Sequence, residues 1–180
     1  MTPARICGWR IWKTCNEKTG TCRINGQSGR ERNGRERKRK MKQGKEQAVK
    51  NFQKSYNCCQ AVACAYCEEL GISERDMFRL TEGFGSGMGG LKDTCGALMG
   101  MFLTISLANS AGDMNDPYAT KMDTYARFLE AAEAFREKRG SLYCRDLKTE
   151  EGLQPLECCV RCVETAAELT DQYLEKKGKR

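Results

Sequence analysis

Residues 94–112 read TCGALMGMFLTISLANSAG, and this stretch decides the fold because it is the longest part of the chain without a charged side chain. Its length alone would allow it to cross a membrane, which takes about 20 residues. Small or polar residues interrupt it, however: Gly96, Gly100, Ser106, Asn109 and Ser110. We therefore reject a membrane span. The stretch predicts a helix over 94–108 that neighbouring helices surround in a soluble bundle.

The rest of the body is expected to be helical as well. No run alternates between apolar and polar side chains, so no strand is predicted. Asn57 and Ser73 are residue types that cap the start of a helix, whereas Gly71 and Gly140 are typical of helix ends. The other helices are expected over 44–54, 58–70, 73–81, 117–139 and 157–176, and 141–156 is expected to be irregular. The predicted fold is all-α, a small bundle of about five to six helices.

Residues 1–40 differ from the body in charge. They hold 12 Lys or Arg and 3 Asp or Glu, so the whole positive excess of the chain lies there, and the remainder carries −2. Low apolar content and high charge predict a disordered basic extension. Because Met41 could open a bacterial protein, we interpret 1–40 as an upstream extension or the result of a misassigned start, and 41–180 as a cysteine-rich helical redox domain. The alternative is a basic arm that touches nucleic acid or acidic lipid.

The composition limits the chemistry. The chain has 12 cysteines and no histidine, which excludes Ser-His-Asp and Cys-His catalysis and every histidine-ligated metal site. No signal peptide or twin-arginine pair is visible near the start, so a cytoplasmic, reducing setting is expected. There, cysteines are expected to be thiols or metal ligands rather than structural disulfides.

Cys95 has the most suggestive surroundings. It follows the glycine-rich run GFGSGMGG (83–90) and Asp93-Thr94, which can cap a helix. A thiol in the first helical turn lies at the positive end of the helix dipole, which favours thiolate, so Cys95 is the candidate nucleophile. The alternative is a buried cysteine that packs as a small hydrophobe. The glycine-rich run lacks the ending of a P-loop and follows no strand, so close backbone approach is its expected use.

The other cysteines are placed by helical spacing. Over 58–70, Cys64 and Cys67 fall in the polar sector, so this CxxC pair is expected to be incidental or solvent-facing. On the last helix, Cys159 and Cys162 share one apolar side, with Cys158 at its edge. Core packing and a ligand site in the bundle interior explain that side equally well.

The cysteine-bearing motifs resemble the C_GCAxxG_C_C family of redox-active proteins. The similarity covers the body but not residues 1–40, and its motifs are YNCCQAV (56–62), GFGSGMGG (83–90), TCGALMG (94–100), SLYCRDL (141–147) and CVRCVETAAEL (159–169). The resemblance implies four characteristic cysteines. Matched motif by motif they are Cys58, Cys95, Cys144 and Cys159. Cys59, Cys64, Cys67, Cys158 and Cys162 depart from the four-cysteine pattern.

The resemblance also implies a redox role and a bound iron–sulfur group. Our first hypothesis is that Cys58, Cys95, Cys144 and Cys159 hold an iron–sulfur cluster for electron transfer with a partner oxidoreductase. The backbone at Gly85, Gly87, Gly89 and Gly96 would approach the cluster closely. The second is a metal-free dithiol, with Cys95 as nucleophile and Cys58 or Cys159 as resolving thiol. The third is a structural zinc site of four cysteines. Nucleic acid is an expected partner only for the basic extension.

Overall fold

The computed structural model describes residues 44–149 and 154–177, which all belong to one unit of the chain, Lys38–Arg180. In these ranges every regular element is helical, apart from one isolated antiparallel bridge between Thr94 and Tyr143. The all-α prediction is therefore confirmed. The predictions for residues 1–40 lie outside the described residues.

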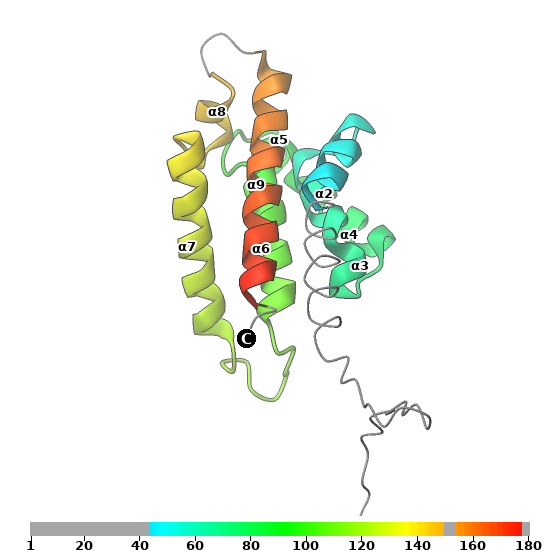
Figure 1. The fold of residues 1–180 in the computed structure, drawn as a ribbon, viewed down its shortest axis with the longest axis vertical. Coiled ribbons are helices and arrows are strands. Elements are labelled where there is room, and N and C mark those ends of the chain that lie inside the picture. Colours follow the sequence, from blue (N-terminus) through cyan, green and yellow to red (C-terminus); the bar gives the residue numbers. More distant parts are fainter. Residues whose placement is uncertain (1–43, 150–153, 178–180) are drawn as a thin grey trace, which may run out of the picture. The chain divides into compact units, whose positions relative to one another are not determined.

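The elements follow one another as short and long helices (Figure 1). After a helix over 44–53, they are α2 (Cys58–Ala63), the 3-10 turn η1 (Cys64–Tyr66), α3 (Cys67–Leu70), α4 (Glu74–Leu80), the 3-10 turn η2 (Glu82–Phe84), α5 (Gly85–Met88), α6 (Gly96–Asn109), α7 (Lys121–Arg139), α8 (Cys144–Leu147) and α9 (Pro155–Lys177).

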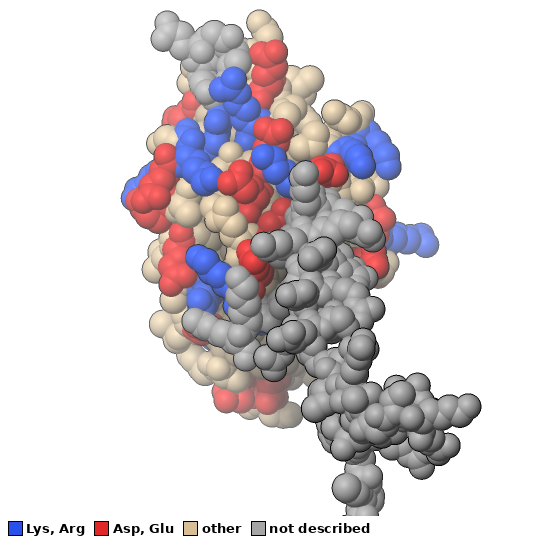
Figure 2. Space-filling view, viewed as in Figure 1, with Lys and Arg blue, Asp and Glu red and all other residues tan. Residues whose placement is uncertain are grey.

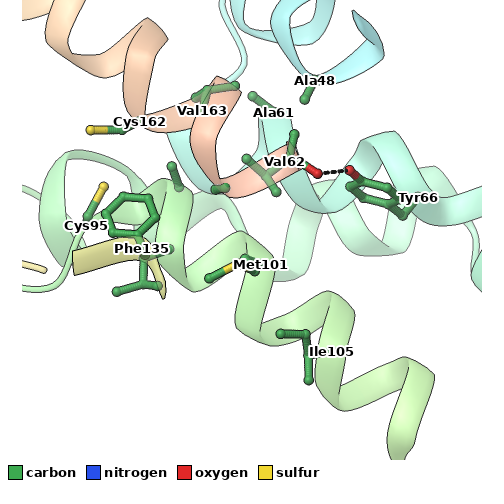
Figure 3. Packing of buried hydrophobic residues seen from close by; sticks show 14 of the residues in the cluster. Ala48, Ala61, Val62, Tyr66, Cys95, Met101, Ile105, Phe135, Cys162 and Val163 are labelled. Carbon is green, nitrogen blue, oxygen red and sulfur yellow. Dashed lines mark hydrogen bonds between the residues drawn. The ribbon is translucent and has the colours of Figure 1, made fainter. Parts of the chain in front are cut away.

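The uncharged helix α6 lies at the centre of the bundle, packed against α2, α7 and α9. Its buried residues Leu98, Met101 and Ile105 join the main apolar cluster, which Phe135 of α7 and Val163 of α9 complete (Figure 3). Burial of these side chains is the main stabilising contribution to such a bundle. Among the described helices, none combines the length and the apolar character needed to cross a bilayer.

Small residues let α6 approach α2 closely. A Cβ atom added at Gly100 would lie 2.8 Å from the carbonyl oxygen of Cys59 and 2.9 Å from the Cβ of Val62. A Cβ added at Gly96 would lie 2.7 Å from the carbonyl oxygen of Phe84 and 3.2 Å from the Cβ of Cys58. The two glycines therefore set the distance between α6, which follows Cys95, and α2, which carries Cys58.

The predicted helix ends agree with the local contacts. The Asn57 side chain accepts hydrogen bonds from the backbone N–H groups of Cys59 and Gln60, and the Gln60 side chain accepts one from the Asn57 N–H, which is a complete capping box. Ser73 caps α4. Gly71 and Gly140 end α3 and α7 in the left-handed conformation.

Three expectations about element bounds are wrong. The helix predicted over 58–70 is divided by the 3-10 turn η1, which shifts the phase of the residues after Ala63. Residues 117–120 form turns, so α7 begins only at Lys121. The segment 141–156, predicted to be irregular, contains the single turn α8 and the first residues of α9.

Lys and Arg side chains lie interspersed with Asp and Glu over the face shown in Figure 2. The described part of that face shows no continuous basic surface, in keeping with the near-neutral charge of the body. The charge on the described part of this face therefore does not point to nucleic acid as a ligand.

Candidate functional site: a pocket of six cysteines

Six cysteines from four segments surround one small cavity, which we call the cysteine pocket. Its volume is about 10 Å³, comparable to the space needed for a single water molecule. Gly96, Leu147 and Lys148 complete its described lining. The six cysteines are Cys58, Cys95, Cys144, Cys158, Cys159 and Cys162.

All four cysteines that the motif matching selected, Cys58, Cys95, Cys144 and Cys159, line this pocket. The structure brings in two more that the pattern did not select. Cys158 is fully buried, and Cys162 is 2% exposed. Both lie within one turn of Cys159 on α9, so helical spacing could have identified Cys162 as a pocket residue.

A short pairing of two loops brings Cys95 and Cys144 together. The Cys95 N–H donates to the carbonyl of Leu142 at 2.8 Å, and the Cys144 N–H donates to the carbonyl of Asp93 at 2.6 Å. These bonds flank the bridge between Thr94 and Tyr143. The segment before α6 and the segment before α8 are thus joined as in a two-stranded ladder, although they are almost 50 positions apart in the sequence.

A left-handed turn over the glycine-rich run supports the pocket from another side. Ser86, Gly87, Met88 and Gly89 all have φ between 52° and 68°, and Gly89 N–H donates to the Gly85 carbonyl at 2.8 Å. Non-glycine residues pay about 1–2 kcal/mol for this conformation. The turn directs the backbone N–H of Ser86 to the sulfur of Cys58, where the hydrogen bond favours the thiolate.

The four glycines proposed for close approach have different surroundings. Gly96 lines the pocket, and a Cβ at Gly87 would lie 2.6 Å from the Cβ of Cys144. Gly85 instead faces Asn57, and a Cβ at Gly89 would reach only the Gly83 carbonyl at 3.4 Å. Close approach in this structure is therefore to neighbouring protein segments, and two of the four glycines touch cysteine-bearing ones.

Inside the pocket, the thiols are paired by hydrogen bonds. Cys58 bonds to Cys159, and Cys95 bonds to Cys162. Figure 3 shows Cys95 and Cys162 on the same side of the apolar core. The second hypothesis paired Cys95 with Cys58 or Cys159, but the structure places Cys162 beside it, because a helix crossing rather than motif order decides which thiols meet.

Each hydrogen bond lowers the pKa of one thiol of the pair and raises the pKa of the other. The bond from Cys58, helped by the charge of Lys148, lowers the pKa of Cys159 to about 6 against the opposing effect of burial. The same bond and burial raise the pKa of Cys58. Near neutral pH, this pair therefore holds one proton between two sulfurs, and Cys159 is its thiolate.

The pair of Cys95 and Cys162 behaves in the same way, contrary to one prediction. The bond from Cys95 lowers the pKa of Cys162, and the neighbouring Arg139 adds to this effect. The hydrogen bond and burial raise the pKa of Cys95, although the N–H groups of Leu98 and Ala97 at the helix start act in the predicted direction. The predicted low pKa of Cys95 is therefore wrong, since the neighbouring thiol outweighs the helix start.

The pKa of Cys144 is influenced by both pairs. Burial raises its pKa, Lys148 opposes that effect, and the charges of Cys95 and Cys159 add to it. Six sulfur donors, the thiolate of Cys159 and nearby cationic side chains make a site that suits oxidation of thiols or capture of a soft metal.

The arrangement is not a preformed site for a single metal ion. Within 44–149 and 154–177, no group of three or more cysteine, aspartate or glutamate side chains has the spacing that would hold one. The sulfurs line one cavity and act on each other in pairs, without the spacing of a site for one ion. Their thiol hydrogens would have to leave before the sulfurs could bind a metal.

A larger cavity of about 450 Å³ lies between α6, α7 and α9. Its described lining contains no cysteine, and Arg127 in that lining pairs with Asp123 at 3.1 Å. Because it lacks the sulfur chemistry, we place the candidate site at the cysteine pocket.

The comparison with known proteins now bears on this pocket. Residues 56–173 match the model of the family described as "Putative redox-active protein (C_GCAxxG_C_C)". The chain belongs to this family. The match spans every segment that lines the pocket, so the resemblance predicted from the motifs is confirmed.

A related protein is known from Archaeoglobus fulgidus. It is 30% identical over 135 residues, which cover 70% of this chain and 89% of the archaeal protein, and it is described as an uncharacterized protein. No solved structure matches the chain. The family description therefore supports a redox role without specifying its chemistry.

Proposed function

We propose that the cysteine pocket binds an iron–sulfur cluster or a similar thiolate-bound metal centre and serves in electron transfer with a partner oxidoreductase. The observation that carries the proposal is the convergence of six cysteines from α2, the start of α6, α8 and α9 on one cavity. A simple dithiol needs only two of them. Cysteine thiolates are the usual ligands of iron–sulfur clusters.

The residues of the pocket fit such a group by their donor chemistry. Cys58, Cys95, Cys144 and Cys159 would hold it, with Cys162 or Cys158 as replacements. When bound, the group would accept and release single electrons. The protein would contribute burial, the Ser86 N–H directed at Cys58, and the positive charge of Lys148 beside Cys159, which offsets thiolate charge.

The second candidate is a metal-free dithiol centre, and the thiol–thiol hydrogen bonds favour it. In the pair of Cys58 and Cys159, the thiolate of Cys159 would attack an external disulfide. Cys58 would then resolve the mixed disulfide. This candidate uses the pocket as it stands and needs no rearrangement of the sulfurs.

Purification of the full chain without oxygen separates the two candidates. Our proposal expects iron and acid-labile sulfide in the protein, a brown colour, and bleaching on reduction with dithionite. Colourless protein without metal, whose pocket thiols all react with a thiol reagent, would overturn the metal centre in favour of the dithiol. One zinc per chain without a redox couple would overturn both in favour of a structural zinc site.

Single substitutions then identify the ligands. Cys95→Ser and Cys58→Ser should each lower the iron content several-fold. Cys64→Ser is the matched control, because Cys64 is a buried cysteine of the same segment that does not line the pocket. Equal loss of iron in all three variants would show a general effect on folding and would contradict the assignment of ligands.

A further inference from the structure

Cys64 and Cys67 are buried, although their predicted place in the polar sector favoured an incidental or solvent-facing pair. They are 6% and 5% exposed, and they form a separate apolar cluster with Ala63 and Met77. The prediction from helical spacing failed for two reasons. The turn η1 changes the phase of the chain after Ala63, and α4 covers this side of it. Gln60 anchors α4 there by donating to the carbonyl of Phe78 at 3.0 Å.

We propose that Cys64 and Cys67 are a second redox site: a dithiol, separate from the cysteine pocket, that small-molecule disulfides oxidise to an intramolecular disulfide. Neither residue lines the pocket, and neither belongs to the apolar cluster that contains Cys95 and Cys162. The proposal therefore goes beyond the proposed function and does not depend on it.

The local geometry suits a disulfide. Residues three apart on a helical turn have Cβ atoms about 5–6 Å apart, and a 3-10 turn brings their side chains closer to alignment. A disulfide needs Cα atoms within about 4.4–6.8 Å and Cβ atoms within about 3.5–4.5 Å, so the two Cβ atoms approach by about 1–2 Å when the bond forms. Cys64 opens the 3-10 turn η1, and Cys67 directly follows it. The sulfur of Cys67 also lies 3.8 Å from the carbonyl oxygen of Ala63.

The two thiols differ in acidity, which assigns their roles. The hydrogen bond from Cys64 lowers the pKa of Cys67, while the same bond and burial raise the pKa of Cys64. Cys67 is therefore the attacking thiol and Cys64 the resolving thiol. The carboxylate of Glu74 raises the pKa of both, and it accepts a hydrogen bond from the Tyr56 hydroxyl at 3.1 Å.

The reaction balances as two exchanges. The Cys67 thiolate attacks one sulfur of the external disulfide, whose S–S bond breaks and releases one thiolate. Cys64 then attacks the sulfur of Cys67, forms the internal disulfide and releases the second thiolate. The two protein thiol protons pass to the two released thiolates, so the protein loses two electrons and the external disulfide becomes two thiols.

Peptide mapping of the full chain tests the proposal directly. The protein is equilibrated with mixtures of oxidised and reduced glutathione, blocked with an alkylating reagent, and digested with chymotrypsin without reduction. Cleavage after Tyr66 separates the two cysteines, so an internal disulfide joins peptide 57–66 to peptide 67–70. We expect this joined species, assigned to Cys64 by fragmentation, and a loss of alkylation at Cys64 and Cys67 that reduction restores.

Three variants sharpen the result. Cys67→Ser should abolish the joined peptides, whereas Cys58→Ser, which alters the cysteine pocket, should leave them unchanged. Glu74→Gln removes a negative charge at an exposed position and should speed the oxidation at neutral pH several-fold. Recovery of the two peptides only as separate alkylated species at the most oxidising ratio would overturn the proposal. A link from Cys67 to Cys58 or Cys59 would overturn it as well. These outcomes are independent of the iron content of the protein, and the wild-type map decides the question even if a variant does not fold.

Discussion

Among alanine substitutions of the turn glycines, Gly87→Ala should disturb the cysteine pocket most. Gly87 has φ +68°, and an added Cβ would lie 2.6 Å from the Cβ of Cys144 and 2.9 Å from backbone atoms of Lys92 and Asp93. Lys92 and Asp93 accept the backbone hydrogen bonds that hold the Cys144 segment. The methyl group therefore pushes directly on the pairing that aligns Cys95 with Cys144.

Two contributions set the size of the effect. Alanine in the left-handed region costs about 1 kcal/mol relative to glycine. Overpacking of a tight site adds about 1–3 kcal/mol, because backbone atoms cannot move aside as a flexible side chain would. Gly87→Ala should thus lower the free energy of unfolding by about 2–4 kcal/mol. For a domain of this size, the melting temperature should fall by about 8–16 °C.

Gly112→Ala is the matched control. Gly112 has φ +66°, and an added Cβ would meet nothing within 4 Å, so this variant carries the conformational cost alone. Urea and thermal unfolding followed by circular dichroism should show a loss of about 1 kcal/mol for Gly112→Ala. Equal destabilisation of the two variants would refute the argument that Gly87 is needed for close approach to Cys144. In addition, Gly87→Ala alone should change the reactivity of the pocket thiols.

Three further predictions follow from the same contacts. Gly100→Ala should destabilise the fold by about 1–2 kcal/mol in urea unfolding, since contact with the Cys59 carbonyl outweighs the better helix propensity of alanine; a stabilised variant would contradict it. Burial raises the pKa of Asp171 from 3.8 to about 6, so the folded state prefers the protonated carboxyl group. This preference adds at most about 3 kcal/mol to the free energy of unfolding, and the addition should be lost as the pH rises from about 4 to 6. Urea midpoints across that range should fall less in Asp171→Asn than in the natural protein, and parallel curves would refute the assignment. Alkylation of Cys159, mapped by mass spectrometry in metal-free protein, should reach half its maximal rate near pH 6, and Cys58→Ala should move that midpoint toward the ordinary thiol value of about 9; an unmoved midpoint would exclude Cys58 as the cause.

Local rules were enough to predict much of the architecture. The capping residues Asn57 and Ser73 and the terminating glycines Gly71 and Gly140 act over three or four residues, so the sequence around them contains all the necessary information. The central position of the uncharged stretch followed from the cost of exposing so many apolar side chains.

The exposure of Cys64 and Cys67 that helical spacing over 58–70 predicted is wrong, partly for a reason that lies outside the segment. A single 3-10 turn shifts the phase by a fraction of a turn, and nothing in the composition of CAYC marks where that turn falls. Packing of α4, fixed by Gln60 and by the edge contact of Tyr56 with Phe78, decided that Cys64 and Cys67 are buried. Solvent exposure inferred from one helix alone cannot include such a neighbour.

For the cysteine pocket, the sequence determined which thiols are available, that no histidine competes with them, and which motif supplies each segment. Only the tertiary structure decided which thiols touch. Cys95 meets Cys162, and Cys58 meets Cys159, because α9 packs against both α2 and α6. The acidity of a thiol follows from such contacts: a hydrogen bond at close range in a buried site outweighs the weaker field of a helix start, and its partner is set by long-range packing rather than by sequence neighbours.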